Sequence, residues 1–208
     1  MRFGALSHSN SLFSPSGPSL VSGAVVNLNT APSSGSTWTD TTGNGYNGTL
    51  NGTYTYTASN GGGIITTVAG TSYISVNYNF VAPFTVSVLA TFNISTYWGS
   101  IWGSEAYGPQ KGYLAYISDD NTLNFGSPNG VGTVTVSGIN TSGPNLWDFT
   151  VDASNNGTIY QNGTSIYTGT ITAPKNGIAA GGTFFGARHV NNSSSPRSEE
   201  HTSELQSH

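Results

Sequence analysis

Residues Gly35–Gly52 of the 208-residue chain have the sequence GSTWTDTTGNGYNGTLNG. It contains three Asn-Gly pairs, and both residues of such a pair tolerate the positive φ angles that tight turns need. Gly and Asn disfavour the interior of a helix, and the stretch is too rich in glycine for one continuous strand. It therefore predicts a series of tight turns that Trp38 anchors to a hydrophobic core.

Short runs of β-branched and aromatic residues recur on both sides of these turns. The strongest is Phe84–Asn93, where every second residue is apolar, as a half-buried strand requires. Hairpins are expected in three places: between Ile64–Val68 and Ser72–Val76, between Gly112–Ser118 and Asn121–Gly126, and between Thr158–Gln161 and Ser165–Thr168. Many short strands with no helical pattern predict an all-β, antiparallel two-layer sandwich or barrel. The predicted strands are Ala24–Thr30, Ile64–Val68, Ser72–Val76, Phe84–Asn93, Gly112–Ser118, Asn121–Gly126, Val131–Val136, Leu146–Asp152, Thr158–Gln161, Ser165–Thr168 and Phe184–Arg188.

Three of these segments are similar to laminin-G-like domains of the concanavalin A-like superfamily. The first joins the strand-like Ala24–Thr30 to a W-x-D pattern followed by glycine-bearing turns. The others are the Y-x-N-G turn within Gly157–Gly169 and the FFGAR sequence of Phe184–Arg188. The resemblance covers roughly Ser22–Arg188 and implies a two-sheet jelly roll. It assigns structural roles to Trp38, Asp40, Asn44, Asn162 and Gly163.

Composition limits the classes of function. Charged residues make up 7% of the chain, against about 25% in typical domains, so the basic patch of a nucleic-acid-binding protein is not expected. Cysteine is absent, which excludes disulfides and thiolate chemistry. No run is long and apolar enough to insert into a membrane, and the N-terminus lacks the apolar core of a signal peptide.

The chain divides into three segments. Residues 1–22 are rich in Ser, Pro and Gly and predict an arm or linker, and residues 23–196 form the predicted sandwich. Residues 197–208, RSEEHTSELQSH, resemble a translated short-read sequencing adapter, as found in metagenomic sequence. A natural acidic tail is the alternative. Under the adapter interpretation this segment pairs with no strand, and the truncated sandwich lacks a last strand beside Ala24–Thr30.

Catalytic chemistry is not expected from the carboxylates. Retaining glycanases of this fold carry closely spaced acidic residues on one strand, and no such pattern is present. Asp148 and Asp152 share a strand face but lie about 13 Å apart at the rise of a strand. Glycosidases need two carboxylates roughly 5–10 Å apart. A calcium site at Asp119 and Asp120 is a weaker hypothesis, because adjacent Asp residues in a turn usually bind backbone N–H groups.

Aromatic residues concentrate in the segment Tyr97–Tyr113. Trp98, Trp102 and Tyr107 present flat apolar faces that suit stacking on sugar rings, so they are the candidate carbohydrate-binding residues. The alternative for both tryptophans is the hydrophobic core.

These observations favour a non-catalytic module that binds a glycan or neighbouring structural subunits. By analogy with Gly/Asn/Thr-rich modules of phage structural proteins, we expect it on a virion or another exposed surface. A secreted bacterial adhesin or polysaccharide-binding module is the alternative, and a glycan hydrolase or lyase is less favoured. No cofactor is expected, apart from the weaker hypothesis of calcium at Asp119 and Asp120.

Overall fold

The computed structural model describes residues 23–28, 35–59, 62–67, 72–92, 99–104, 111–118, 120–127, 132–174, 182–186 and 201–204. Within these ranges every element of regular secondary structure is a β-strand or a bridge, and every pair of neighbouring strands is antiparallel. No helix in the described ranges is long and apolar enough to cross a membrane.

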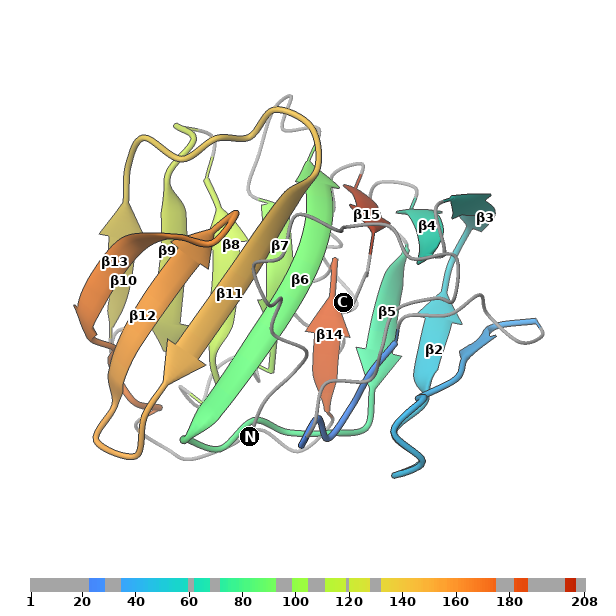
Figure 1. Cartoon of the computed structure of the whole chain (residues 1–208), viewed down its shortest axis with the longest axis horizontal. Coiled ribbons are helices and arrows are strands. Elements are labelled where there is room, and N and C mark those ends of the chain that lie inside the picture. The colour runs from blue at the N-terminus through green and yellow to red at the C-terminus, as the bar shows by residue number, and fades with distance from the viewer. Residues whose placement is uncertain are drawn as a thin grey trace.

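The strands form two sheets (Figure 1). The eight-stranded sheet has the order β1 (Thr37–Trp38), β2 (Gly48–Asn51), β5 (Tyr73–Val76), β14 (Thr183–Phe185), β7 (Gly99–Gly103), β8 (Leu114–Ile117), β9 (Leu123–Ser127) and β10 (Gly132–Val136). The seven-stranded sheet has the order β13 (Thr164–Thr170), β12 (Asn156–Gln161), β11 (Asn145–Val151), β6 (Phe84–Phe92), β15 (His201–Glu204), β4 (Gly62–Thr67) and β3 (Tyr54–Ser59).

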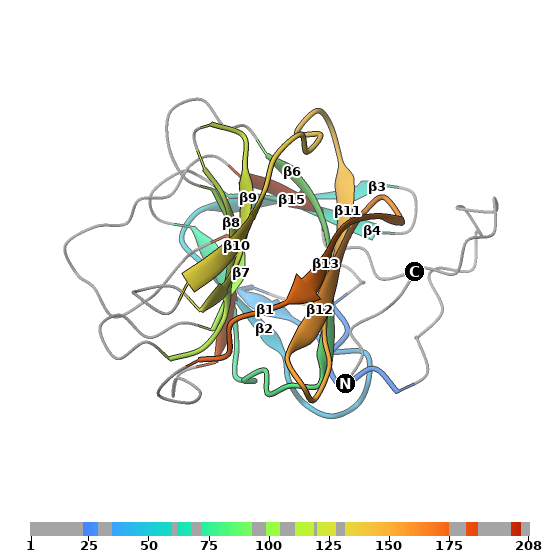
Figure 2. The same cartoon turned by 90° about the vertical axis from the view of Figure 1, so that its left-hand side faces the viewer.

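The two sheets pack face to face around an aromatic core (Figure 2). Trp102 on β7 and Phe125 on β9 meet Phe149 on β11, with ring centroids 5.9 and 5.0 Å apart. Phe84 on β6 lies 5.9 Å from Trp102 in an edge-to-face arrangement, which aromatic pairs prefer. The predicted antiparallel two-sheet sandwich is therefore confirmed.

Local sequence explains the strands that carry the seven-stranded sheet. In β6 the side chains of Phe84, Val86, Val88 and Ala90 are buried and the residues between them are half-buried, which is the predicted alternation. The predicted hairpin of β12 and β13 closes through Asn162 and Gly163. Their φ angles of 51° and 76° are those of a two-residue type I′ turn, which Asn-Gly favours.

The W-x-D pattern fixes the first turns of the chain to the core. Trp38 is fully buried, and Gly48 lies opposite it in the β1–β2 pair. A Cβ atom on Gly48 would lie 2.9 Å from Leu28 Cδ1 and 3.3 Å from Trp38 Cβ, so only glycine fits there without displacement. A side chain at this position would therefore have to displace Leu28, so the packing around Trp38 favours the glycine of this Asn-Gly pair.

Asp40 is buried and accepts hydrogen bonds from the loop that follows it, as the pattern predicts. Its Oδ1 accepts the N–H of Asn27 at 2.9 Å and that of Thr42 at 3.0 Å. Its Oδ2 accepts the N–H of Tyr46 at 3.2 Å and the hydroxyl of Thr42 at 2.7 Å. These bonds satisfy a buried carboxylate that would otherwise destabilise the fold.

The prediction of a strand at Ala24–Thr30 is wrong for the described residues 23–28. Ala24 forms an isolated bridge, and Val26 and Leu28 are buried outside any strand. The reason is that the backbone of Asn27 forms hydrogen bonds with Asp40 and Thr41 of the following loop instead of with a neighbouring strand. Its N–H reaches the carboxylate of Asp40, and its carbonyl accepts the N–H of Thr41 at 2.9 Å.

The predicted hairpin between Ile64–Val68 and Ser72–Val76 is also wrong. β4 pairs with β3 in the seven-stranded sheet, whereas β5 pairs with β2 and β14 in the other sheet. β4 instead forms a hairpin with the preceding strand β3, in which Ser59 pairs with Gly62, and Asn60-Gly61 separate these two residues in the sequence. Asn-Gly is a stronger hairpin signal than Ala69-Gly70-Thr71.

The expectation that residues 197–208 pair with no strand is wrong for His201–Glu204. These residues form β15, which pairs with β4 from His201↔Thr67 to Glu204↔Ile64 and with the end of β6. Pairing in a sheet uses backbone N–H and C=O groups, which every residue except proline supplies whatever its side chain. The position between β4 and β6 can therefore be filled by a polar sequence.

Replacement of Trp38 by alanine tests the anchoring role of the W-x-D pattern. Loss of a fully buried indole should lower the free energy of unfolding by about 3–5 kcal/mol, measured by denaturant titration. Val81 is 58% exposed, so Val81→Ala is the control and should change stability by less than about 0.5 kcal/mol. Equal stabilities of the two variants would show that Trp38 does not anchor the fold.

Candidate ligand-binding face

The outward surface of β6, β11, β12 and β13 carries polar side chains in cross-strand rows. Because Phe149 and Val151 point into the core, Asp148 and Thr150 point outward. The strand register places the outward-facing residues of neighbouring strands beside one another. We call these two rows the polar face: one contains Thr85, Thr150, Thr158 and Thr168, and the other contains Ser87, Asp148, Tyr160 and Ser165.

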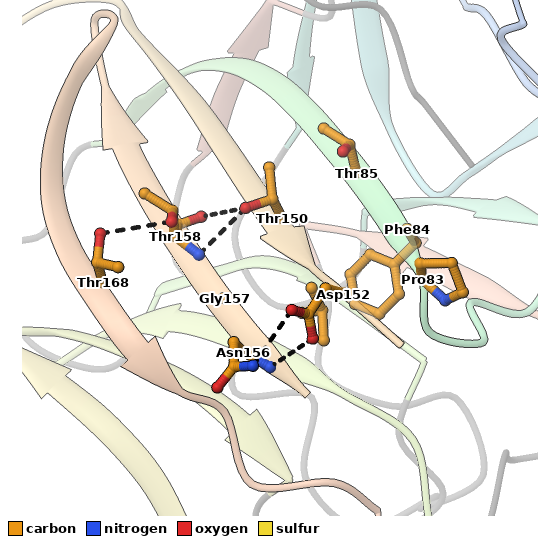
Figure 3. Close-up of a pocket in the computed structure, with 10 residues that line it drawn as sticks. Pro83, Phe84, Thr85, Thr150, Asp152, Asn156, Gly157, Thr158 and Thr168 are labelled. Carbon is orange, nitrogen blue, oxygen red and sulfur yellow. Dashed lines mark hydrogen bonds between the residues drawn. The ribbon is translucent and has the colours of Figure 1, made fainter. Parts of the chain in front are cut away.

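An open pocket of about 360 Å³ lies where the threonine row meets the end of the sheet (Figure 3). The four threonines supply one part of its lining, and the turn between β11 and β12 supplies another. The full lining consists of Pro83, Phe84, Thr85, Thr150, Val151, Asp152, Asn156, Gly157, Thr158 and Thr168. The pocket therefore offers hydroxyl, carboxylate and amide groups beside a small apolar area.

Hydrogen bonds hold the hydroxyls of the polar face in place (Figure 3). Thr150 Oγ1 donates to the carbonyl oxygen of Thr158 at 3.0 Å and accepts its N–H at 3.1 Å. Thr168 Oγ1 donates to Thr158 Oγ1 at 3.4 Å, and Ser87 Oγ donates to Asp148 Oδ1 at 2.5 Å. Side chains fixed in this way lose little conformational freedom when a ligand binds.

Asp152 bounds the pocket as the first residue of the β11–β12 turn. Its Oδ1 accepts the N–H groups of Ser154 and Asn156, each at 2.8 Å, and its Oδ2 accepts the side-chain amide of Asn156 at 3.2 Å. The hydrogen bond from the backbone of Asn156 is the main cause that lowers the pKa of the Asp152 carboxyl below its ordinary value of 3.8. Asp152 is thus an ionised acceptor at neutral pH.

Trp102 does not belong to a sugar-binding surface, and its prediction as a carbohydrate-binding residue is wrong. It is fully buried, and its ring lies 5.0 Å from that of Phe80 and 5.9 Å from that of Phe149. The reason is that β7 has β14 and β8 as its neighbours, and all five of its residues are buried. Trp98 and Tyr107, the other two aromatic candidates, lie outside the described residues.

The calcium candidates occupy the turn between β8 and β9. Asp119 lies outside the described residues, and Asp120 Oδ1 accepts the hydroxyl of Ser118 at 2.6 Å and that of Thr122 at 2.6 Å. The Ser118 hydrogen bond is the main cause that lowers the pKa of Asp120. Within the described ranges no three His, Cys, Asp or Glu residues come together in a way that could hold a metal ion.

The other motif residues make structural contacts away from the polar face. Asn44 donates its side-chain amide to the carbonyl oxygen of Val25 at 3.0 Å. Asn162 accepts the N–H of Leu146 at 2.8 Å and donates to the side chain of Asn145 at 2.8 Å, while Gly163 completes the turn. Both asparagines therefore stabilise turns at the ends of the sandwich.

The polar face could not be predicted from the sequence. Its threonines occur at positions 85, 150, 158 and 168, and only the strand register brings them into one row. The available signal was the alternation in Phe84–Phe92 and in Asn145–Val151, whose polar positions predict outward side chains. That alternation gives the direction of each side chain but not its neighbours on other strands.

The lowered pKa of Asp152 predicts a stability difference that depends on pH. A carboxyl whose pKa is lower in the folded state stabilises the fold above its unfolded-state pKa, and this contribution disappears as pH falls through the folded-state value. Asp152→Asn should therefore be less stable than the wild type above about pH 5, and the difference should shrink toward about pH 2. Thermal unfolding across this range measures it, and a constant difference would contradict the assigned cause.

The fold is similar to those of solved toxin domains. The receptor-binding domain of a botulinum neurotoxin C/D mosaic serotype is 13% identical over 88% of this chain and 48% of its own, with a TM-score of 0.59. The binding domain of Paraclostridial Mosquitocidal Protein 1 is 14% identical over 88% of this chain and 48% of its own, with a TM-score of 0.57.

A third similar structure comes from botulinum neurotoxin type C, whose cell entry is described as dependent on two ganglioside molecules. It is 13% identical over 86% of this chain and 46% of its own, with a TM-score of 0.59. The chain therefore spans about half the length of these structures. No protein-family model and no curated protein matches the sequence. At these identities the likeness establishes the β-sandwich fold.

Proposed function

We propose that this chain is a non-catalytic carbohydrate-binding module of a surface-exposed structural protein. The observation that carries the proposal is the polar face, where Tyr160 and Asp148 lie among Thr and Ser hydroxyl groups beside an open pocket. Sugars bind through their hydroxyl groups and through the flat apolar face of the ring. A half-buried tyrosine among hydroxyls and a carboxylate supplies both kinds of contact.

The composition of the polar face favours a glycan over a protein partner. The buried centres of protein interfaces are enriched in large aromatic side chains and depleted of Asp and Ser. Among the eight residues that define the polar face, only Tyr160 is aromatic, and the other seven are Thr, Ser or Asp. Tightly bound protein partners also usually bury well over 1,000 Å², far more than these two rows provide.

The acidic residues of this surface suit binding better than hydrolysis. Asp148 lies on β11 and Asp152 begins the turn that follows it, four residues later, so at the rise of a strand they are separated by about 13 Å. That separation exceeds the range of about 5–10 Å between the two carboxylates of glycosidases. Asp148 also accepts a hydrogen bond from the hydroxyl of Ser87, and Asp152 accepts one from the backbone N–H of Asn156 in its own turn.

The location of the module, on a virion or another exposed surface, is proposed by analogy. The fold is shared with toxin domains, one of which has ganglioside partners, and the motif around Trp38 and Asp40 resembles laminin-G-like domains. A virion surface or an extracellular surface fits the low charge of the chain, with a secreted bacterial adhesin as the alternative. We also propose the segment that contains Trp98 and Tyr107 as a second glycan contact.

A glycan array probed with the purified chain tests the proposed function. We expect binding to at least one glycan class, and no release of reducing ends when the bound glycan is incubated with the protein. Heat-denatured protein controls for adsorption. Binding to no glycan above this control contradicts a carbohydrate-binding role, and release of reducing ends contradicts a non-catalytic one.

A further inference from the structure

We infer that the polar face binds a neutral, linear glycan whose chain runs across strands β6, β11, β12 and β13. This inference rests on the proposed function and assigns it a location, a ligand class and an orientation.

The charges of this surface select against acidic glycans. Asp148 lies in the middle of the polar face and Asp152 lies at its edge, in the pocket lining. Lys111 is the one Lys or Arg in the described ranges, and it precedes β8 of the opposite sheet. A carboxylate or sulfate on the ligand would meet these like charges, and the described residues of β6, β11, β12 and β13 include no Lys or Arg that could pair with it. A neutral sugar can instead donate its hydroxyl hydrogens to the carboxylate oxygens.

The dimensions of the polar face fit an oligosaccharide. Each row crosses four strands, so its length is about 14 Å at an inter-strand distance of about 4.8 Å. The two rows are separated by two residues along β6, β11 and β12, or about 7 Å, and by three residues along β13, where the register shifts. A surface of this shape accommodates a short linear segment lying along the rows, with one edge toward the threonines and the other toward Tyr160.

The residues of the two rows have complementary roles in this arrangement. Tyr160 lies directly opposite Asp148 in the β11–β12 pair, so a sugar ring placed on the phenol ring brings its hydroxyls beside the carboxylate. Thr158 lies between Thr150 and Thr168, and its hydroxyl already accepts a hydrogen bond from Thr168. That donation leaves the Thr158 hydroxyl hydrogen to point at a ligand oxygen.

The test compares named probes on wild-type protein and on three variants of the polar face. Cellohexaose, xylohexaose and mannohexaose are the neutral probes, and hexagalacturonate and 3′-sialyllactose are the acidic ones. Calorimetry should show that at least one neutral probe binds about tenfold or more tightly than either acidic probe. Tyr160→Ala should weaken that binding by about tenfold or more, and the isosteric variants Asp148→Asn and Thr158→Val by about threefold or more.

Tyr116→Ala is the matched control. Tyr116 is a half-buried strand tyrosine like Tyr160, but it belongs to β8 of the opposite sheet. This variant should bind the neutral probe as the wild type does. Thermal unfolding of every variant separates loss of binding from loss of fold, and the two isosteric variants keep the test decisive if Tyr160→Ala unfolds.

The outcomes distinguish this inference from the proposed function. Unchanged neutral binding in Asp148→Asn, Thr158→Val and folded Tyr160→Ala would place the site elsewhere and overturn the inference, while carbohydrate binding would stand. Tighter binding of an acidic probe, or binding to none of the three neutral hexasaccharides, would also overturn it. Self-association that Thr158→Val abolishes, without any glycan binding, would assign the polar face to a protein partner and overturn both.

Discussion

The contact between Trp102 and Phe149 across the two sheets is the constraint on which the rest of the structure depends. Their rings lie 5.9 Å apart, and both side chains are fully buried. Because side chains alternate along a strand, an inward Phe149 requires an outward Asp148 and Thr150. A shift of one residue in β11 would expose Phe149 and bury a carboxylate, which costs several kcal/mol or more. The core therefore determines which residues reach the surface.

The polar face follows from this constraint together with the antiparallel register. Pairing of β11 with β6 and β12 places Ser87 and Tyr160 on either side of Asp148, and pairing of β12 with β13 extends the threonine row to Thr168. The Asn162-Gly163 turn fixes the register at one end of β12, and Asp152 fixes the turn at the other. A binding surface on paired strands is held more rigidly than one on loops, which favours a ligand of defined spacing.

Sequence patterns predicted the parts of the fold that depend on local chemistry. The alternation of Phe84–Phe92 and the Asn162-Gly163 hairpin were predictable because period and turn type are encoded by neighbouring residues. The change of sheet between β4 and β5 was not predictable, because it depends on which strands pair over long distances. Trp102 was misassigned for a similar reason: its aromatic neighbours look like a binding segment until the central position of β7 is known.

Binding of a neutral glycan to the polar face can be measured by amide chemical-shift mapping during titration with cellohexaose, xylohexaose or mannohexaose. We expect the largest ¹H–¹⁵N shifts on strands β6, β11 and β12, at Ser87, Asp148, Thr158 and Tyr160, with small shifts on β8. Shifts confined to the segment around Trp98 and Tyr107, or shifts that avoid β11 and β12, would contradict binding at the polar face.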